Sequence, residues 1–564
     1  MGTWLKKRWD KGKMLSDLRP AIFLSLAACF MLFLFAPVEI YLGNQDEFWY
    51  DAYLLFPFLI KDFLFFLGVF LLGFTLAYLL GKRVYMGALY GVFTCFAACY
   101  IQGNYRVGGL PPFDGTEVRW ELYRSEIWKD IFLWAGVAAV VLVLLFVLKS
   151  KRFMTLVSAA GIFFLLMLGS TLAVLGVSGG LLEQKQFVKF TKKDQFEMST
   201  DTNFILLVLD AIDESCFWQV WEQHPEYKEA MADFTFYNNA MSGYAYTDHS
   251  LPLMLSGEWF ENQESYEDYA LRIYRNSPFF ERLEGEGYSL SFYDDELQFE
   301  VGQMDGEFAN MAYAKSTLWD PELFNGRLLK MTGIKYAPYF LKPYCWFDPN
   351  KLKHQQMGAK DEELFVWTNG AFYQDLRQEE ISLVEGKRFK LIHLMGAHVP
   401  FKYDKDMNEI EDADYFSCIE SSMTVTMAYL DKLREAGVYD NSIILVLSDH
   451  GYNISGDAVD TPQRDESQYG RQHPILFVKG LGEKHEMKIS GAPISYEDLV
   501  GAYDRLLEGS LSDECFAYRE GDQRERRYLL YKYLGEDHMV EYVQKGHAGD
   551  EETLVPTGRT FDAK

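Results

Sequence analysis

Cysteine is scarce in this 564-residue chain, with seven residues in all and no C-x-x-C pair. A thiolate zinc site is therefore disfavoured, and the wide spacing is no disulfide framework, although the four cysteines of the polar part could still form two disulfides. Positive charge is also in short supply, because 54 lysines and arginines face 81 acidic residues and leave a net charge of -27. So acidic a chain disfavours nucleic acid as a partner. Internal repeats and low-complexity tracts are lacking as well.

Long apolar runs are confined to the first third of the chain. Five of them approach the ~20 residues needed to cross a bilayer, namely residues 21–41, 63–80, 84–101, 131–148 and 153–177. They carry no ionisable side chain at mid-depth, which argues for an anchor rather than a transporter. The first run is long and is followed by further runs, so it is not a cleavable signal peptide.

Basic residues indicate the orientation of these runs. They cluster before the first run and in the short loops after the second and fourth, at Lys6, Lys7, Arg8, Lys11, Lys13, Lys82, Arg83, Lys149, Lys151 and Arg152. Such loops stay in the cytoplasm, so five crossings would leave everything after residue 177 outside. We expect a five-span transmembrane domain at 1–177, a linker at 178–202, a catalytic domain at 203–512 and a C-terminal extension at 513–564.

Three apolar runs in the second part end in side chains that can bind metals. They are 204–210, ending in Asp210, 390–398, which contains His393 and ends in His398, and 443–451, with Asp449 and His450. Such runs predict strands covered on both faces, as in a mostly parallel sheet with helices on both sides. The carboxyl ends of parallel strands meet at one edge. A single strand-terminal Asp is more commonly a cap, but three such strands predict an α/β domain with a site at that edge.

A fourth signal lies in residues 241–257, which predict a loop leading into a short helix. The helix would begin near Thr247, with Pro252 in its first turns and Gly257 ending it. A threonine at such a position is usually only an N-cap.

The motifs together resemble one superfamily. Thr247, Ser250 and Pro252 form T-x-x-S-x-P, residues 393–400 form H-x-x-G-x-H-x-P, and residues 448–451 and 472–474 read S-D-H-G and Q-H-P. In this order they resemble the alkaline phosphatase and sulfatase superfamily, and within it the membrane-bound phosphoethanolamine transferases and lipoteichoic acid synthases. The matching region runs from about residue 203 to 478. The resemblance implies an alkaline-phosphatase-like domain in a bacterial plasma membrane protein, with the catalytic part outside the cytoplasm.

The candidate site then has a chemical interpretation. Asp210, Thr247, Asp449 and His450 supply three oxygens and one imidazole, a mixed set that suits Zn²⁺ or Mn²⁺. Thr247, bound to a cation at a helix N-terminus, could be held as an alkoxide and attack phosphorus, giving a phospho-threonine ester.

Histidines are the candidate proton donors and substrate ligands. His398 and His473, with His393 as a weaker candidate, are the natural donors to a leaving alkoxide. The resemblance assigns the matching histidines to the substrate phosphate, or to a second metal.

Two sulfatase features are absent. Ala211 follows Asp210 where sulfatases carry paired aspartates, and no C-x-P-x-R element surrounds Thr247. We therefore expect a metal-dependent transferase that moves phosphoglycerol or phosphoethanolamine from a membrane phospholipid to an extracytoplasmic glycan or glycolipid. The alternatives are a phosphodiesterase, phosphatase or sulfatase-type hydrolase on the same scaffold, or a degenerate glycan-binding surface protein.

Overall fold

The computed structural model describes residues 11–44, 51–106, 118, 120–182, 186–294, 299–300, 304, 307–315, 321–347, 364–452, 471–532 and 535–563. The chain divides into two compact units. We call Met1–Gln186 with Lys315–Ala359 the helical unit, and Phe187–Ala314 with Lys360–Lys564 the α/β unit.

The helical unit contains four helical stretches long and apolar enough to cross a membrane, among the residues that the structure describes. The first comprises α2 (Lys11–Phe30), the π-helix η1 (Met31–Phe35) and α3 (Ala36–Leu42), and the second η3 (Ala52–Leu55) and α4 (Phe56–Leu80). The other two are α5 (Lys82–Tyr105) and α6 (Arg124–Ser178), the latter preceded by η5 (Trp120–Tyr123).

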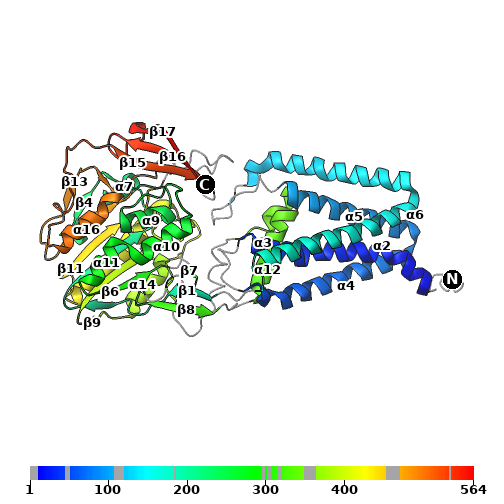
Figure 1. Ribbon diagram of the computed structural model, residues 1–564, viewed down its shortest axis with the longest axis horizontal. Helices are drawn as coiled ribbons and strands as arrows, with labels where there is room; N and C mark the ends of the chain where they lie inside the picture. The colour runs from blue at the N-terminus through cyan, green and yellow to red at the C-terminus, as the bar shows by residue number, and fades with distance from the viewer. Residues whose placement is uncertain are drawn as a thin grey trace. The chain divides into compact units, whose positions relative to one another are not determined.

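The prediction of five separate spans is wrong, because the fourth and fifth predicted runs both lie in α6. The basic segment that joins them contains neither glycine nor proline, so the chain remains helical up to both sides of a single residue. That residue is Lys149, whose φ of 56° breaks the helix. Figure 1 shows α6 folding back on itself.

A second segment of the chain completes the helical unit. Helix α12 (Pro321–Tyr336) and η6 (Tyr339–Tyr344) come from the middle of the sequence. The ammonium of Lys61 lies 2.7 Å from the Glu322 carboxylate, and the Asn325 amide donates to Asp62 at 2.6 Å. Phe324 and Leu328 are buried in one cluster with apolar side chains of α3 and α4. Helix α12 is therefore held to α4 at Lys61 and Asp62, the charged residues of α4.

A mixed seven-stranded sheet forms the centre of the α/β unit. Its order is β13-β4-β12-β11-β3-β10-β6. The strands are β13 (Lys488–Ser490), β4 (Thr235–Tyr237), β12 (Leu476–Lys479), β11 (Ser442–Leu447), β3 (Asn203–Leu209), β10 (Lys387–Leu394) and β6 (Tyr288–Tyr293). The four strands β11, β3, β10 and β6 are parallel, as predicted, whereas β12 runs antiparallel to both of its neighbours.

Both faces of this sheet are covered. Alternate residues of β3 enter two different clusters, Phe204, Leu206 and Val208 the first, and Ile205, Leu207 and Leu209 the second. The first cluster includes α9 (Thr247–Ser256), α10 (Tyr266–Asn276), α11 (Pro278–Gly285) and α16 (Leu499–Leu507), and the second α7 (Glu214–Trp221), α8 (Pro225–Ala230), α14 (Asn369–Gln378) and α15 (Tyr415–Glu435). The predicted helical cover on both sides of the sheet is confirmed. Successive side chains of a strand point to opposite faces, and both sets are apolar here, so each face of the sheet packs against helices.

Smaller elements surround the sheet. They are β1 (Gln186–Phe190) with β7 (Phe299–Glu300) and β8 (Met311–Lys315), β2 (Glu197–Ser199) with β9 (Ser382–Val384), β5 (Ala240–Met241) with β14 (Ile494–Ser495), and the turns η8 (Tyr496–Asp498) and η9 (Glu551–Thr553). A last sheet comprises β15 (Arg526–Lys532), β16 (Gly535–Gln544) and β17 (Leu554–Asp562), with β15 at its edge as predicted. The Leu529 amide donates to the Gly243 carbonyl at 2.9 Å, which supports the loop before α9. All seven cysteines are free thiols.

Candidate metal centre

Three predicted ligands meet at the carboxyl ends of β3 and β11. These strands are parallel neighbours, with Leu447 opposite Val208, so the residues that follow them emerge side by side. Asp210, Asp449 and His450 are all buried, and their ligand atoms lie within 4.8 Å of one another. Ala211 adopts a φ of 57°, and this turn directs its amide to Oδ1 of Asp449 at 3.1 Å. A strained turn of this kind is common at functional sites.

Thr247 reaches the same cluster from the first turn of α9. Its Oγ1 donates to Oδ2 of Asp449 at 2.5 Å. Tyr246, not Thr247, occupies the N-cap position, and it makes no side-chain cap. Thr247 is thus not the N-cap of α9, and its hydroxyl contacts the cluster. Ser250, one turn later, donates to the backbone carbonyl of Asp449 at 2.5 Å. Two hydroxyls thus fasten α9 to the end of β11, and of these Thr247 alone contacts a candidate ligand side chain.

The orientation of His450 suits metal binding. Its Nδ1–H donates to the Gly451 carbonyl at 2.7 Å, which leaves Nε2 as the acceptor atom of the neutral ring. This Nε2 lies 3.4 Å from Oδ2 of Asp449 and 3.6 Å from Oδ1 of Asp210. Burial lowers the pKa of His450 despite the neighbouring Asp449. A neutral imidazole with a free Nε2 is the form that ligates a cation.

His393 faces the other side of Asp210. Its Nε2 lies 3.8 Å from Oδ2 of Asp210, and its Nδ1–H donates to Asp294 at 2.7 Å. Burial by itself lowers the pKa of His393, but Asp294, Asp210 and Asp449 outweigh it and raise the pKa to about 10. Sequence reasoning missed Asp294, although it follows β6 in the same strand-then-carboxylate pattern as Asp210. We assign it to positioning His393.

His398 is held against the cluster by the loop after β10. A Cβ added at Gly396 would lie 2.3 Å from the Asp210 carbonyl oxygen, so only glycine permits this approach. The Ala397 amide donates to the same oxygen at 2.9 Å. The ring of Trp367, which carried no sequence signal, lies 5.3 Å from His393 and 6.0 Å from His398. The loop thus brings the backbone next to His398 against Asp210, and one indole contacts the rings of both His393 and His398.

His473 occupies a different environment. Its Nε2–H donates to the Asn238 carbonyl at 2.9 Å, and the ring lies 5.2 Å from that of His547. Burial lowers its pKa to about 3. In the part of the chain that the structure describes, no recorded hydrogen bond or ion pair joins His473 to the four candidate ligands, so its predicted role stays a prediction.

Arg471 supplies a cation that sequence reasoning missed. Its guanidinium lies 5.2 Å from the ring of Tyr246 and 5.6 Å from the ring of Tyr452. Tyr246 directly precedes Thr247, and Tyr452 lies two residues after His450. Its charge contributes to the lowered pKa of His450. A planar cation beside the cluster is suited to a substrate phosphate. Its only sequence signal was its position directly before the Q-H-P motif.

The donor set fits a divalent cation. Asp210 and Asp449 are buried carboxylates, exposed by 1% and 0%, and together with Asp294 they outnumber the single protonated imidazole of His393, which leaves negative charge that a divalent cation would offset. The neutral His450 does not provide that charge, but it does provide a ligand atom. Two carboxylates, one imidazole and the Thr247 hydroxyl match the mixed oxygen and nitrogen set of a four-coordinate site.

Comparison with known proteins agrees with this geometry. The sulfatase family model matches residues 202–503, more than half of the chain. No curated protein matches. Among solved structures, the lipooligosaccharide phosphoethanolamine transferase EptA from Neisseria meningitidis is 11% identical, with 89% of this chain and 98% of that chain covered and a TM-score of 0.31.

Two further structures show the same level of likeness. The lipoteichoic acid synthase LtaP from Listeria monocytogenes is 12% identical, with coverage of 61% and 85% and a TM-score of 0.33. The putative sulfatase YidJ from Bacteroides fragilis is 11% identical, with coverage of 61% and 84% and a TM-score of 0.37. Such distant likenesses select no substrate. The family match and the motifs agree, and this chain belongs to the sulfatase family.

Proposed function

We propose that this protein is a metal-dependent transferase that moves a phospho-alcohol head group, phosphoglycerol or phosphoethanolamine, from a membrane phospholipid to an extracytoplasmic glycan or glycolipid. The observation that carries the proposal is the contact of the half-buried Thr247 hydroxyl with Asp449 in a cluster suited to Zn²⁺ or Mn²⁺. Sulfate ester hydrolysis is not favoured, because Thr247 stands where sulfatases need a residue convertible to formylglycine.

The first step would transfer the head group to the protein. A bound divalent cation would lower the pKa of the Thr247 hydroxyl and offset the phosphate charge. The Thr247 hydroxyl would lose its proton to solvent on ionising, Oγ1 attacks phosphorus, and the bond from phosphorus to the diacylglycerol oxygen breaks. The Nδ1–H of His398 donates to the Val399 carbonyl at 2.6 Å, so the protonated ring still has its Nε2 proton to give to the departing alkoxide. Arg471 holds the phosphate oxygens.

The second step would release the head group to the acceptor. An acceptor hydroxyl attacks phosphorus, the bond to Thr247 Oγ1 breaks, and the imidazole of His398 takes the acceptor's proton. The four apolar helices support a lipid donor over a soluble one, since they hold the chain at the bilayer where such donors reside. With water in place of the acceptor, the same geometry would catalyse hydrolysis, which makes the fate of the head group the decisive measurement.

Vesicles containing the full-length protein and phospholipid labelled in the head group test this function. We expect diacylglycerol to appear together with label on the protein or on an added glycolipid, and chelation of divalent metal to stop both. Release of all the label as a free phospho-alcohol, unaffected by acceptor, would instead show a hydrolase. Absence of diacylglycerol from vesicles of phosphatidylglycerol and of phosphatidylethanolamine would refute the proposed donor class.

We also propose that the α/β unit lies outside the cytoplasm. The bend of α6 at Lys149 is flanked by Lys151 and Arg152, and it lets the helix return to the face on which it began. A cysteine at the exposed Glu551 should therefore react with a membrane-impermeant maleimide on intact cells.

The background for this labelling is favourable. Cys216, Cys418 and Cys515 are buried, Cys29, Cys95 and Cys99 lie within the apolar helices α2 and α5, and Cys345→Ser removes the remaining half-buried thiol. Lys82→Cys, in the predicted inner loop, is the matched control and should react only after lysis. The reverse pattern, with Lys82→Cys labelled on intact cells and Glu551→Cys only after lysis, would place the α/β unit in the cytoplasm.

A further inference from the structure

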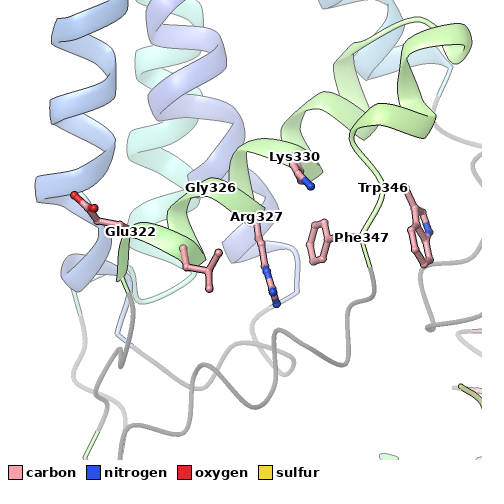
Figure 2. A pocket seen from close by; sticks show the side chains of 7 residues that line it. Glu322, Gly326, Arg327, Lys330, Trp346 and Phe347 are labelled. Atoms are coloured by element: carbon pink, nitrogen blue, oxygen red, sulfur yellow. The ribbon is translucent and has the colours of Figure 1, made fainter. Parts of the chain in front are cut away.

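A groove runs along one face of α12 in the helical unit, with a volume of about 520 Å³ (Figure 2). Its walls combine cations with apolar and aromatic side chains, Leu323, Arg327, Lys330, Trp346 and Phe347. Gly326 lies between them, and a Cβ added there would meet no atom within 4 Å, so the middle of the groove is open. None of these residues belongs to the candidate metal centre.

The groove lies at a boundary between polar and apolar surface. Helix α12 contacts α4 through Lys61 and Asp62, which are the charged residues of that helix, and the apolar run 63–80 that follows them is long enough to cross a bilayer. On its inner side, α12 buries Phe324 and Leu328. A helix that contacts α4 at these charged residues lies at the depth where lipid head groups meet the hydrocarbon, and tryptophan is enriched at this depth.

The lining residues that the structure describes include two cations, Arg327 and Lys330, and one carboxylate, Glu322. Arg327 and Lys330 are three residues apart on α12 and therefore lie on one face. Glu322, at one end of the groove, is 2.7 Å from Lys61, which offsets its charge. The Arg327 guanidinium is 5.6 Å from the Phe347 ring, and Figure 2 shows both side chains directed to the same space. A guanidinium and an ammonium one helical turn apart suit the oxygens of a phosphate.

We infer that this groove binds an anionic glycerophospholipid. Its phosphate lies between Arg327 and Lys330, and the glycerol and first methylenes lie along Leu323, which is 44% exposed, and beside Trp346. A zwitterionic head group is less suited, because its ammonium would meet two cations. The site is independent of the proposed transferase reaction, so it can be tested on the protein in detergent without turnover.

The test is a titration of the purified full-length protein with fluorescent phosphatidylglycerol in detergent micelles. Arg327→Gln/Lys330→Gln should weaken binding about tenfold or more, because two charge-assisted contacts are lost. Gly326→Leu should weaken it comparably by filling the groove, and leucine favours a helix over glycine, so this variant should fold even if the double variant does not. Thermal unfolding measurements verify that the double variant and the Gly326→Leu variant are folded.

The control is Lys228→Gln/Arg377→Gln, which removes the same charges from exposed positions of α8 and α14 and should bind like the wild type. Unlabelled phosphatidylglycerol should compete far better than phosphatidylcholine or glycerol 3-phosphate. Wild-type affinity in a folded Gly326→Leu protein would overturn the inference. Equal competition by phosphatidylcholine would show apolar binding only, and equal competition by glycerol 3-phosphate would show a phosphate site with no preference for lipid; either result also overturns it.

Discussion

Replacing Thr247 with alanine is expected to reduce head-group transfer by at least ~10³-fold without unfolding the protein, as befits loss of a covalent nucleophile. The Thr247 hydroxyl is half-buried and contacts the Asp449 carboxylate at 2.5 Å. Two nearby hydroxyls are committed elsewhere, since Ser250 donates to the Asp449 carbonyl and Ser242 to that of Tyr244. Neither is placed to replace it. The measurement is diacylglycerol release from labelled vesicles.

Ser250→Ala is the matched control for this variant. It removes a hydroxyl from the same helix and should cost about 1 kcal/mol of stability through the lost hydrogen bond, yet retain the nucleophile. Mass spectrometry of wild-type protein incubated with donor lipid should find the phospho-alcohol on the peptide that contains Thr247. An adduct on Ser250, or undiminished transfer by Thr247→Ala, would mean that another hydroxyl attacks.

Asp449→Asn is expected to remove most of the bound metal. The variant loses a buried negative charge, whereas its amide oxygen can still accept from the Ala211 amide, now at 3.1 Å from Asp449 Oδ1, so the turn after β3 should persist. Changes in residues that only orient a metal ligand cost 10–100-fold in affinity, and loss of a ligand should cost at least ~100-fold. Elemental analysis of the purified protein measures this, with circular dichroism verifying the fold.

Asp248→Asn removes one carboxylate from an exposed position next to Thr247 and serves as the charge-matched control. It should retain as much metal as the wild type. Stoichiometric metal in Asp449→Asn would contradict the assignment of this residue as a ligand. Equal metal loss in both variants would show a dependence on net charge near the site rather than on the ligand set.

Much of the candidate site could be predicted from local sequence. Apolar runs ending in Asp210 and in Asp449 and His450 indicated strands, because two-sided burial requires apolar residues at both positions of the period-two repeat. Parallel strands then deliver their following residues to one edge. The role of His473 stays a prediction, because a motif match does not say where a side chain points, and the Nε2–H of His473 donates to the Asn238 carbonyl.

Residues whose importance depends on neighbouring strands could not be identified in this way. Asp294 ends a strand like many others, and only the pairing of β6 with β10 places its carboxylate on the Nδ1–H of His393. Trp367 precedes α14, and only the packing of that segment sets its ring between His393 and His398. Both depend on contacts between segments distant in sequence.

By itself, the sequence predicted the apolar helices, the covered strands and the grouping of Asp210, Thr247, Asp449 and His450, since an apolar run and the residues that follow it are local features of the sequence. Tertiary structure alone decided the rest. The fourth and fifth apolar runs became the two halves of α6, which meet at the non-helical residue Lys149. Helix α12 joined the helical unit through Glu322, Asn325 and its apolar face, since its partners lie more than 250 residues earlier in the chain.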